Sequence, residues 1–391
     1  MRSLSCQMFA ASAAILLSLS GTQAREVAPI KIGFITTLST PDGYIGEDLR
    51  DGFQLAMTNG KLGNVPVQIE IRDDAMDPGN AKRAAEAMIQ SGVKLFTGVG
   101  FSNVLDAVVP SVLESGGLYV SLSPGPSAFA GAKCHPNYFV ASYQDDTIHE
   151  AAGLSANNLG YKRVVLVAQD NQTGRYAMEG FKRAFSGRVI AELHTQPDQI
   201  DFSIELGRIH TLAPDAVYQF HPGKSGIRFM TQYANTDLDK SVAMLIPSSS
   251  MDAHMIEATG AASEGIYASA IWTTELDNAA STAFVSAFHR TYARTPTLYA
   301  QQAYDTANLI GSALKRVEGN INETSELRKA LFTARFTAVR GGFAFGANQH
   351  PIQDYYLTRF ERGSSGKIVQ QIVHRVAAVY GDKYAGRCRL D

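Results

Sequence analysis

Hydroxyl-bearing and glycine residues follow two neighbouring apolar segments in the first third of the chain. Gly98-Val99-Gly100 is followed by Ser102 and Asn103, and the stretch Ser121–Ser127 (SLSPGPS) follows the next apolar segment. A helix that starts at Ser102 would offer unpaired N–H groups and a partial positive charge, which suit a carboxylate. These residues therefore indicate an anion site. The alternative is that they only cap a helix and form a turn.

Motifs for the common catalytic and metal chemistries are absent from the sequence. The nine histidines include no pair three or four residues apart, the spacing of a helix-borne zinc site. There is no G-x-S-x-G and no G-x-x-x-x-G-K-[ST]. Asn103 stands where a dinucleotide fingerprint needs its third glycine. We therefore expect a protein that is not an enzyme and that uses no cofactor and no metal.

The segments around these turns alternate between strand and helix patterns. Lys31–Ser39 reads as a buried strand, Val65–Ile71 as a half-buried one and Lys94–Gly100 as a third. Amphipathic helices are expected between them, and Asp77-Pro78 forms a typical helix start. This β-α-β-α-β order predicts a doubly wound parallel sheet. A second series of the same kind begins near Tyr161.

Length and charge limit the possible functions. A chain of 391 residues is too long for one ordinary core and predicts two domains. The formal charge of −2 provides no basic field for nucleic acid. Nucleic-acid binding is therefore not expected.

Residues 1–24 read as a secretory signal peptide. Arg2 precedes an apolar run, and Thr22-Gln23-Ala24 provides the small residues of a cleavage site. A membrane anchor is the alternative, but the apolar run is short for a span. No later stretch looks able to span a bilayer, so we expect a soluble mature chain. Cleavage would remove Cys6 and leave Cys134 and Cys388, an even count that favours a disulfide in an oxidising compartment.

The sequence of residues 32–103 resembles the leucine/isoleucine/valine-binding family of type I periplasmic solute-binding proteins. The shared features are IGFITTLS, the Tyr-x-Gly before the first helix, DDAMDP and a strand ending in G-x-x-S. The likeness continues through SPGPS, NQTG, FHPG and AYDTA, and so covers nearly all of the chain after residue 30. HEAAG, GFKRAF, DFSIEL and the C-terminal YA…C look like the subgroup associated with aromatic acids. Better-known members of the family place a disulfide near the DDAxDP stretch, where this chain has Met76.

The resemblance implies an α/β fold of two doubly wound parallel-sheet lobes joined by a three-strand hinge. The crossings would lie near Tyr143, Thr273 and Gln353. Residues 25–142 plus 274–352 would form the N-terminal lobe, and residues 143–273 plus 353–391 the C-terminal lobe. The two helices expected after Trp272 would return to the N-terminal lobe.

The resemblance also implies a ligand site between the lobes. Ser102, Asn103, Ser123, Gly125 and Ser127 would hold a carboxylate, and the other matching positions would line the rest of the pocket. Those positions are Tyr44, Tyr143, Gln172, Gly174, Phe220, Ser248 and Ser249. Each aromatic residue could equally belong to the core. Trp272 is read as core.

One loop departs from the pattern of the amino-acid binders. They carry a glutamate there to pair with the ammonium group of the ligand, whereas this chain has Ser248-Ser249-Ser250. An unpaired ammonium group in a closed cleft would cost several kcal/mol. We therefore expect a small organic acid, an aromatic carboxylate, captured by hinge closure. Asp170 and Asp252 are near in sequence and could replace the missing charge.

The implied biological role is delivery of the ligand to the membrane permease of an ABC importer. The protein would act in the periplasm as a monomer. Two alternatives stay open: a branched-chain amino acid or amide binder of the same fold, and the ligand-sensing domain of a receptor or regulator.

Overall fold

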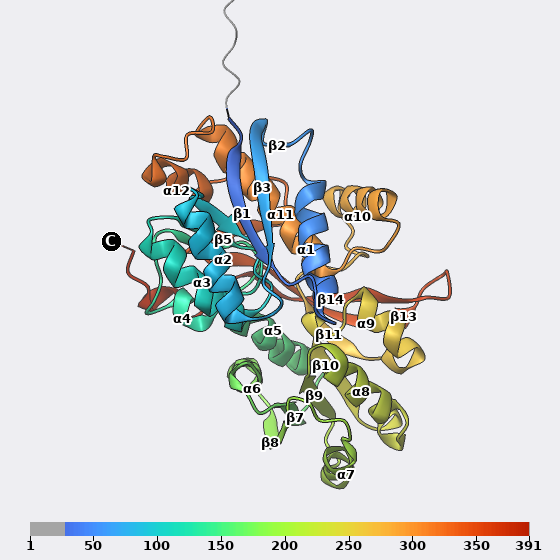
Figure 1. Ribbon diagram of the computed structural model, residues 1–391. Coiled ribbons are helices and arrows are strands. Elements are labelled where there is room, and N and C mark those ends of the chain that lie inside the picture. The colour runs from blue at the N-terminus through green and yellow to red at the C-terminus, as the bar shows by residue number, and fades with distance from the viewer. Residues whose placement is uncertain (1–27, 391) are drawn as a thin grey trace, which may run out of the picture.

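The computed structural model describes residues 28–390, so the expected signal peptide and Cys6 lie outside the described residues. The chain forms two β-sheets, each covered by helices on both faces, and Figure 1 shows one sheet above the other. The prediction of an α/β fold with two doubly wound lobes is confirmed. The predicted lobe boundaries stay a prediction.

The first sheet has the strand order β2-β3-β1-β4-β5-β6. The strands from β3 to β6 are parallel, and only the short β2 runs antiparallel to β3. The last five residues of β1 are all buried, as a strand covered on both faces requires. The strands are β1 (Ile30–Thr36), β2 (Lys61–Leu62), β3 (Val65–Asp73), β4 (Leu95–Thr97), β5 (Leu118–Ser121) and β6 (Tyr138–Val140).

Helices cover both faces of this sheet. Apolar side chains of α2 and α3 pack on one face, and those of α1, α11 and α12 pack on the other. The predicted start of α2 is confirmed: the Asp77 side chain accepts a hydrogen bond from the Asn80 N–H (2.6 Å). The helices are α1 (Gly43–Leu55), α2 (Pro78–Gln90), α3 (Ser102–Glu114), α4 (Ser127–Ala130), α10 (Ala279–Tyr292), α11 (Leu298–Arg316) and α12 (Thr324–Phe332).

The second sheet is mixed. Its strands run in the order β12-β13-β11-β10-β9-β7-β8, with β14 paired to β13. The strands from β11 to β8 are parallel, whereas β13 is antiparallel to its three neighbours. The strands are β7 (Arg163–Gln169), β8 (Arg188–Thr195), β9 (Ala216–Phe220), β10 (Ala243–Pro247), β11 (Tyr267–Ala270), β12 (Phe343–Phe345), β13 (Pro351–Arg362) and β14 (Ile368–Tyr380).

Two helix layers enclose the second sheet. The helices α5 and α6 pack on one face, and α7, α8 and α9 pack on the other. They are α5 (Asp145–Asn158), α6 (Gln172–Ala184), α7 (Ser203–Leu212), α8 (Gly223–Ala234) and α9 (Ala253–Thr259). Short 3₁₀ turns occupy Asp237–Lys240, Ser248–Ser250, Gly260–Ser263 and Ala385–Arg387.

Within the described residues, the chain passes three times between the sheets: from β6 to α5, from β11 to α10, and from α12 towards β13. Two crossings are tied together at Ser142, whose carbonyl accepts from Arg340 Nη1 (2.9 Å) and Gln353 Nε2 (3.0 Å). Buried Arg340 also faces the Asp305 carboxylate at 3.6 Å. These contacts hold the hinge strands in a fixed arrangement.

The C-terminal tail returns to the first lobe. After β14, Cys388 forms a disulfide with Cys134, which lies in the loop between α4 and β6. The C-terminal end accordingly lies beside α3 and α4 in Figure 1. The tail thus adds a covalent link between the strand pair β13–β14 and the first lobe. The family resemblance implied that residues 353–391 belong to the C-terminal lobe.

Candidate functional site

The predicted ligand residues lie at the carboxyl ends of parallel strands in both sheets. In open α/β sheets, ligands bind at this edge, where neighbouring strands lead to helices on opposite faces. From the first sheet come Tyr44 at the start of α1, Ser102 and Asn103 at the start of α3, and Ser123, Gly125 and Ser127 after β5. From the second come Gln172 and Gly174 at the start of α6, Phe220 at the end of β9, and Ser248 and Ser249 after β10.

Tyr44 reaches across to the opposite lobe. Its hydroxyl donates to Asp252 Oδ2 (2.9 Å), and its ring stacks on His254 with centroids 4.5 Å apart. Burial and the nearby Asp252 carboxylate raise the pKa of Tyr44, so the phenol stays protonated and acts as a donor. Tyr44 therefore joins the lobes.

A second contact joins the lobes through Tyr299 on α11. Its hydroxyl donates to the Ser249 carbonyl (3.3 Å) in the serine loop. Tyr143 lies in the first crossing and is buried in an apolar cluster with Trp272 and Phe284. Of the candidate residues, Tyr44 and Ser249 thus lie where the lobes meet, together with Tyr299 and Asp252.

Several serine hydroxyls at this edge are buried without a partner. Within residues 28–390, the Oγ atoms of Ser123, Ser248 and Ser250 make no hydrogen bond, and the three residues are at most 3% exposed. Leaving a buried hydroxyl unsatisfied costs about 1–3 kcal/mol. Such groups are explained if a ligand supplies their partner.

Ser127 differs from these serines because its hydroxyl is already occupied. It donates to Asp146 Oδ1 (2.9 Å) and accepts from Gln144 Nε2 (3.1 Å). Asp146 is also bound by Arg183 and by the Tyr384 hydroxyl. The single proton of Ser127 is therefore used inside the protein, which leaves its side chain no free donor for a carboxylate.

The two predicted glycines allow close approach of other groups. A Cβ added to Gly125 would lie 2.7 Å from His350 Nε2, and one added to Gly174 would lie 2.0 Å from the Gln169 carbonyl oxygen. At α6 the Asn171 side chain caps the helix by accepting from the Gly174 N–H (2.8 Å). Local packing therefore already accounts for glycine at both positions.

The remaining predicted residues differ in exposure. Ser102 is half-buried, whereas Asn103 and Gln172 are exposed. Phe220 is half-buried and meets the His149 ring edge-on, with centroids 5.0 Å apart. Ser102 and Gln172 each occupy the first turn of a helix, where free N–H groups remain.

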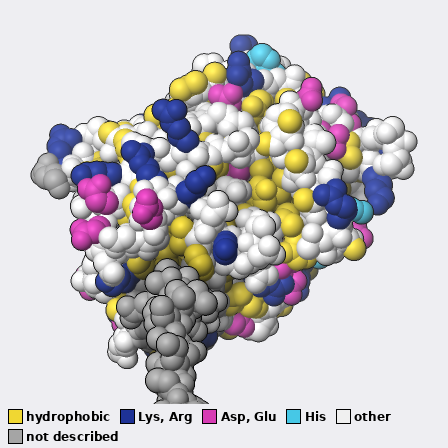
Figure 2. All heavy atoms as spheres, turned by 90° about the horizontal axis from the view of Figure 1, so that it is seen from above, with side chains coloured by type: hydrophobic (Ala, Val, Ile, Leu, Met, Phe, Trp, Pro, Cys, Tyr) yellow, Lys and Arg dark blue, Asp and Glu magenta, His cyan; other side chains and the backbone are white. Residues whose placement is uncertain are grey.

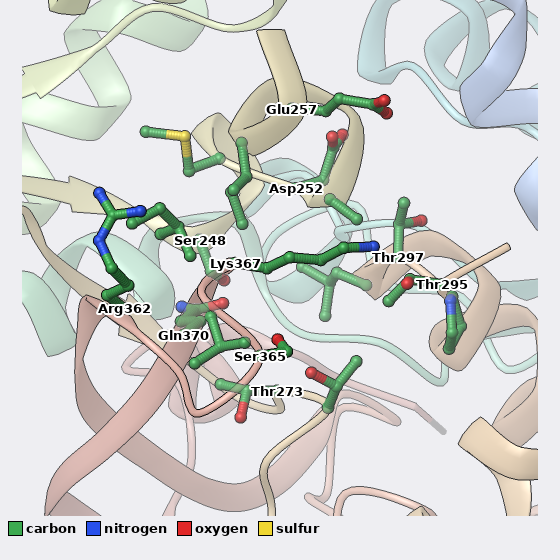
Figure 3. A pocket seen from close by; sticks show the side chains of 18 of the residues that line it. Ser248, Asp252, Glu257, Thr273, Thr295, Thr297, Arg362, Ser365, Lys367 and Gln370 are labelled. Atoms are coloured by element: carbon green, nitrogen blue, oxygen red, sulfur yellow. The ribbon is translucent and has the colours of Figure 1, made fainter. Parts of the chain in front are cut away.

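A cavity of about 560 Å³ lies beside this edge, between the lobes. Its walls come from α9, from the turn between β13 and β14, and from the loop before α11. Figure 3 shows the Lys367 side chain pointing from that turn towards the Thr295–Thr297 loop. Of the predicted ligand residues, only Ser248 lines this cavity. Asp252, which the sequence suggested only as a possible partner for an ammonium group, and Lys367, which was not predicted, line it as well.

The two acidic residues near the serine loop have different surroundings. Asp170 is exposed and pairs with Arg175 (2.8 Å), so its charge is neutralised away from the interior. Asp252 is 5% exposed and caps α9 by accepting from the Met255 N–H (2.9 Å). Burial raises the pKa of Asp252. Asp252 is therefore the acidic residue that bears on ligand charge.

Some other features have simpler explanations. Within residues 28–390, no group of three or more His, Cys, Asp or Glu side chains is arranged to hold a metal ion. No helix in that range has the length and apolar character needed to cross a membrane. On the face in Figure 2, Lys and Arg side chains are scattered among acidic and uncharged ones. Trp272 is 3% exposed and donates to Ser281, as expected of a core residue.

The sequence and the fold both match known proteins. A family model described as periplasmic binding protein matches residues 29–367. A solute-binding protein of an ABC transporter from R. palustris, solved in complex with benzoate, superposes with a TM-score of 0.84. It is 28% identical, and the match covers 93% of this chain and 100% of that one.

Curated relatives agree with this match. The Leu/Ile/Val-binding protein homolog 4 of Brucella abortus is 25% identical over 365 residues, 85% of this chain and 84% of that protein. The Leu/Ile/Val-binding protein BraC3 of Rhizobium johnstonii is 29% identical over 208 residues, so this match spans only 56% of that protein. These relatives are binding proteins, which confirms the expectation of a protein that is not an enzyme. The chain belongs to the periplasmic binding protein family, as a solute-binding protein of the leucine/isoleucine/valine-binding type that serves ABC transporters.

Proposed function

We propose that this protein captures a small aromatic carboxylate between its lobes and delivers it to the membrane permease of an ABC importer. It would act in the periplasm as a monomer. The proposal rests on the charge of the groups where the lobes meet. The unpartnered hydroxyls of Ser123, Ser248 and Ser250 are uncharged, and the buried Asp252 carboxylate already accepts from two donors. The benzoate complex of a relative with 28% identity supports the same ligand class.

Ligand charge follows from what the two lobes offer. Ser123 after β5 and the N-terminus of α3 provide donors for a carboxylate. Ser248 and Ser250 on the other lobe can bond a hydroxyl or carbonyl group, but they cannot neutralise an ammonium group. A buried ammonium group without a carboxylate partner would cost several kcal/mol. A ligand that is anionic at one end and uncharged elsewhere therefore fits better than an α-amino acid.

Hinge closure would follow from binding groups on both lobes. The contacts Tyr44–Asp252 and Tyr299–Ser249 cross between the lobes and can form only when the lobes approach. A ligand that touches both Ser123 and the serine loop would favour that closed state by its extra contacts there.

A thermal-shift screen of aromatic and aliphatic acids against amino acids would test this function. A ligand that binds only the native state raises the unfolding midpoint. Ser123→Ala and Ser102→Ala should each weaken carboxylate binding about tenfold or more, because a hydrogen bond to a charged group contributes roughly 1.5–3 kcal/mol. Ser203→Ala, on the exposed start of α7, is the matched control and should bind like the parent. Parental affinity in both pocket variants would place the anion elsewhere.

An amino-acid binder is the second candidate, and one observation favours it. Asp252 is a buried carboxylate in the loop after β10, and curated relatives are named as Leu/Ile/Val-binding proteins. If Asp252 held an ammonium group, leucine would bind at micromolar concentration and Asp252→Asn would abolish that binding.

A further inference from the structure

The surroundings of Asp252 determine what else this carboxylate can bind. Its Oδ1 accepts from the Met255 N–H and its Oδ2 accepts from the Tyr44 hydroxyl, both at 2.9 Å. Among the described residues, no Lys, Arg or His nitrogen forms an ion pair with it within 4 Å. Its hydrogen bonds thus come from two neutral donors, one from each lobe, and the neighbouring His254 also stabilises its charge.

Tyr44 is held in this position by more than one contact. Its ring lies against His254, and its hydroxyl points to Asp252. Both contacts are with the loop and helix that follow β10, 208 residues away in the sequence. The hydroxyl therefore occupies one of the about four lone-pair positions of the carboxylate, the one that faces the opposite lobe.

We propose that Tyr44 masks Asp252, and that this hydrogen bond makes the protein select against ligands that carry an ammonium group. The inference rests on the proposed function and adds the residue pair that sets ligand charge. An ammonium ligand that approaches Asp252 from the side of the first lobe must displace the Tyr44 hydroxyl and lose its own hydration, whereas an uncharged group leaves the Tyr44–Asp252 bond intact and loses less hydration.

Removing the mask should change which ligand binds. Without the Tyr44 hydroxyl, Asp252 would lose its one side-chain donor and keep only backbone N–H groups, and a buried carboxylate with too few donors is costly. A ligand ammonium group could then supply the missing partner at the edge of the 560 Å³ cavity, which Asp252 also lines. The specificity-determining residue is thus Tyr44, acting through Asp252.

The matched ligands for the test are 3-phenylpropanoate and L-phenylalanine, which differ only by the α-amino group. Calorimetry would compare the parent with Tyr44→Phe, which keeps the ring on His254 and removes the hydroxyl. We expect Tyr44→Phe to bind L-phenylalanine at least tenfold more tightly than the parent does, with no such gain for 3-phenylpropanoate. Tyr44→Phe/Asp252→Asn should lose the gain in affinity, since an uncharged amide cannot neutralise an ammonium group. Tyr161→Phe, a half-buried tyrosine between α5 and β7, is the control and should bind both ligands like the parent.

The outcomes separate this inference from the proposed function. If the parent binds the carboxylate and a correctly folded Tyr44→Phe gains no affinity for L-phenylalanine, the mask is wrong and the proposed function stands. If the gain appears but persists in the double variant, Asp252 is not the group being masked, and the inference is again overturned. If the parent itself binds amino acids and Asp252→Asn abolishes that binding, both proposals are wrong.

Discussion

Removing the disulfide between Cys134 and Cys388 should cost several kcal/mol of stability. The bond closes a loop of 254 residues, and a loop of that length restricts the unfolded chain by about 5.5 kcal/mol at 25 °C in the chain-entropy model. Native disulfides typically contribute about 2–5 kcal/mol when removed. We therefore expect Cys134→Ser/Cys388→Ser to lower the free energy of unfolding by about 3–5 kcal/mol.

Contacts of the tail that do not depend on the disulfide remain in this variant. The Tyr384 hydroxyl donates to Asp146 (2.5 Å), and Asn348 donates to Asp382 (3.0 Å). The Asn348 bond ties the tail to the segment before β13 and the Tyr384 bond ties it to the start of α5, so the tail should stay in place in the folded state and most of the loss would come from the freed unfolded chain. The double variant is preferred to single ones, since a lone cysteine could form intermolecular bonds.

Urea unfolding at equilibrium would measure the effect. Trp272 is the single tryptophan of the chain and is buried beside the second crossing, so its fluorescence reports on the hinge region. Agreement with circular dichroism would justify a two-state treatment. The parent under reducing conditions should unfold like the double variant. A free energy within about 1 kcal/mol of the oxidised parent would refute the argument.

Three further predictions concern the hinge, acid stability and closure. Arg340→Met should destabilise the protein by about 3–5 kcal/mol in urea, because it leaves buried Asp305 without its cation; equal stability would show that the pair is dispensable. Burial lowers the pKa of His149 from 6.5 to about 4, so its contribution is complete above pH 6.5 and is lost as pH falls towards 4. Between pH 6.5 and pH 4 the parent should therefore lose up to about 3 kcal/mol more of its free energy of unfolding than His149→Gln loses. Parallel plots of unfolding free energy against pH for the two proteins would contradict this. Small-angle scattering should give a smaller radius of gyration with saturating ligand, and an unchanged radius would remove the closure mechanism.

Much of the fold could be predicted because strands and helices repeat at fixed periods. The strands β1, β3 and β4 and the starts of the helices α2 and α3 lie close to where the sequence patterns placed them. The helices α10 and α11 pack against α1 of the first lobe, and the lobe boundaries stay a prediction. The spacing of apolar residues was sufficient to locate these elements because each helix buries one face and leaves the other more exposed, while β1 and β4 are short, mostly buried runs.

Other elements were not predicted because they lack a readable pattern. Ten residues of α5 are buried, among them Ala151, Ala152 and Gly153, since the helix is enclosed between α6 and the second sheet. A helix buried around most of its surface shows no apolar stripe. The strand β8 and the helices α7 and α12 were missed as well.

The site was predictable as a sheet edge but not as a set of contacts. The strand ends indicated the region where Tyr44 and the serine loop lie, but Asp252 is 208 residues from Tyr44 and no sequence period links them. Tyr299 was read only as part of a helix. The Ser127–Asp146 bond was equally hidden, because it depends on where two separate helices start.

Calorimetry of the parent protein with benzoate and with leucine tests the central claim most directly. The unpartnered serine hydroxyls and the bond from Tyr44 to Asp252 predict that benzoate binds tightly and that leucine shows no binding at millimolar concentration. Micromolar binding of leucine together with no binding of benzoate would contradict the account.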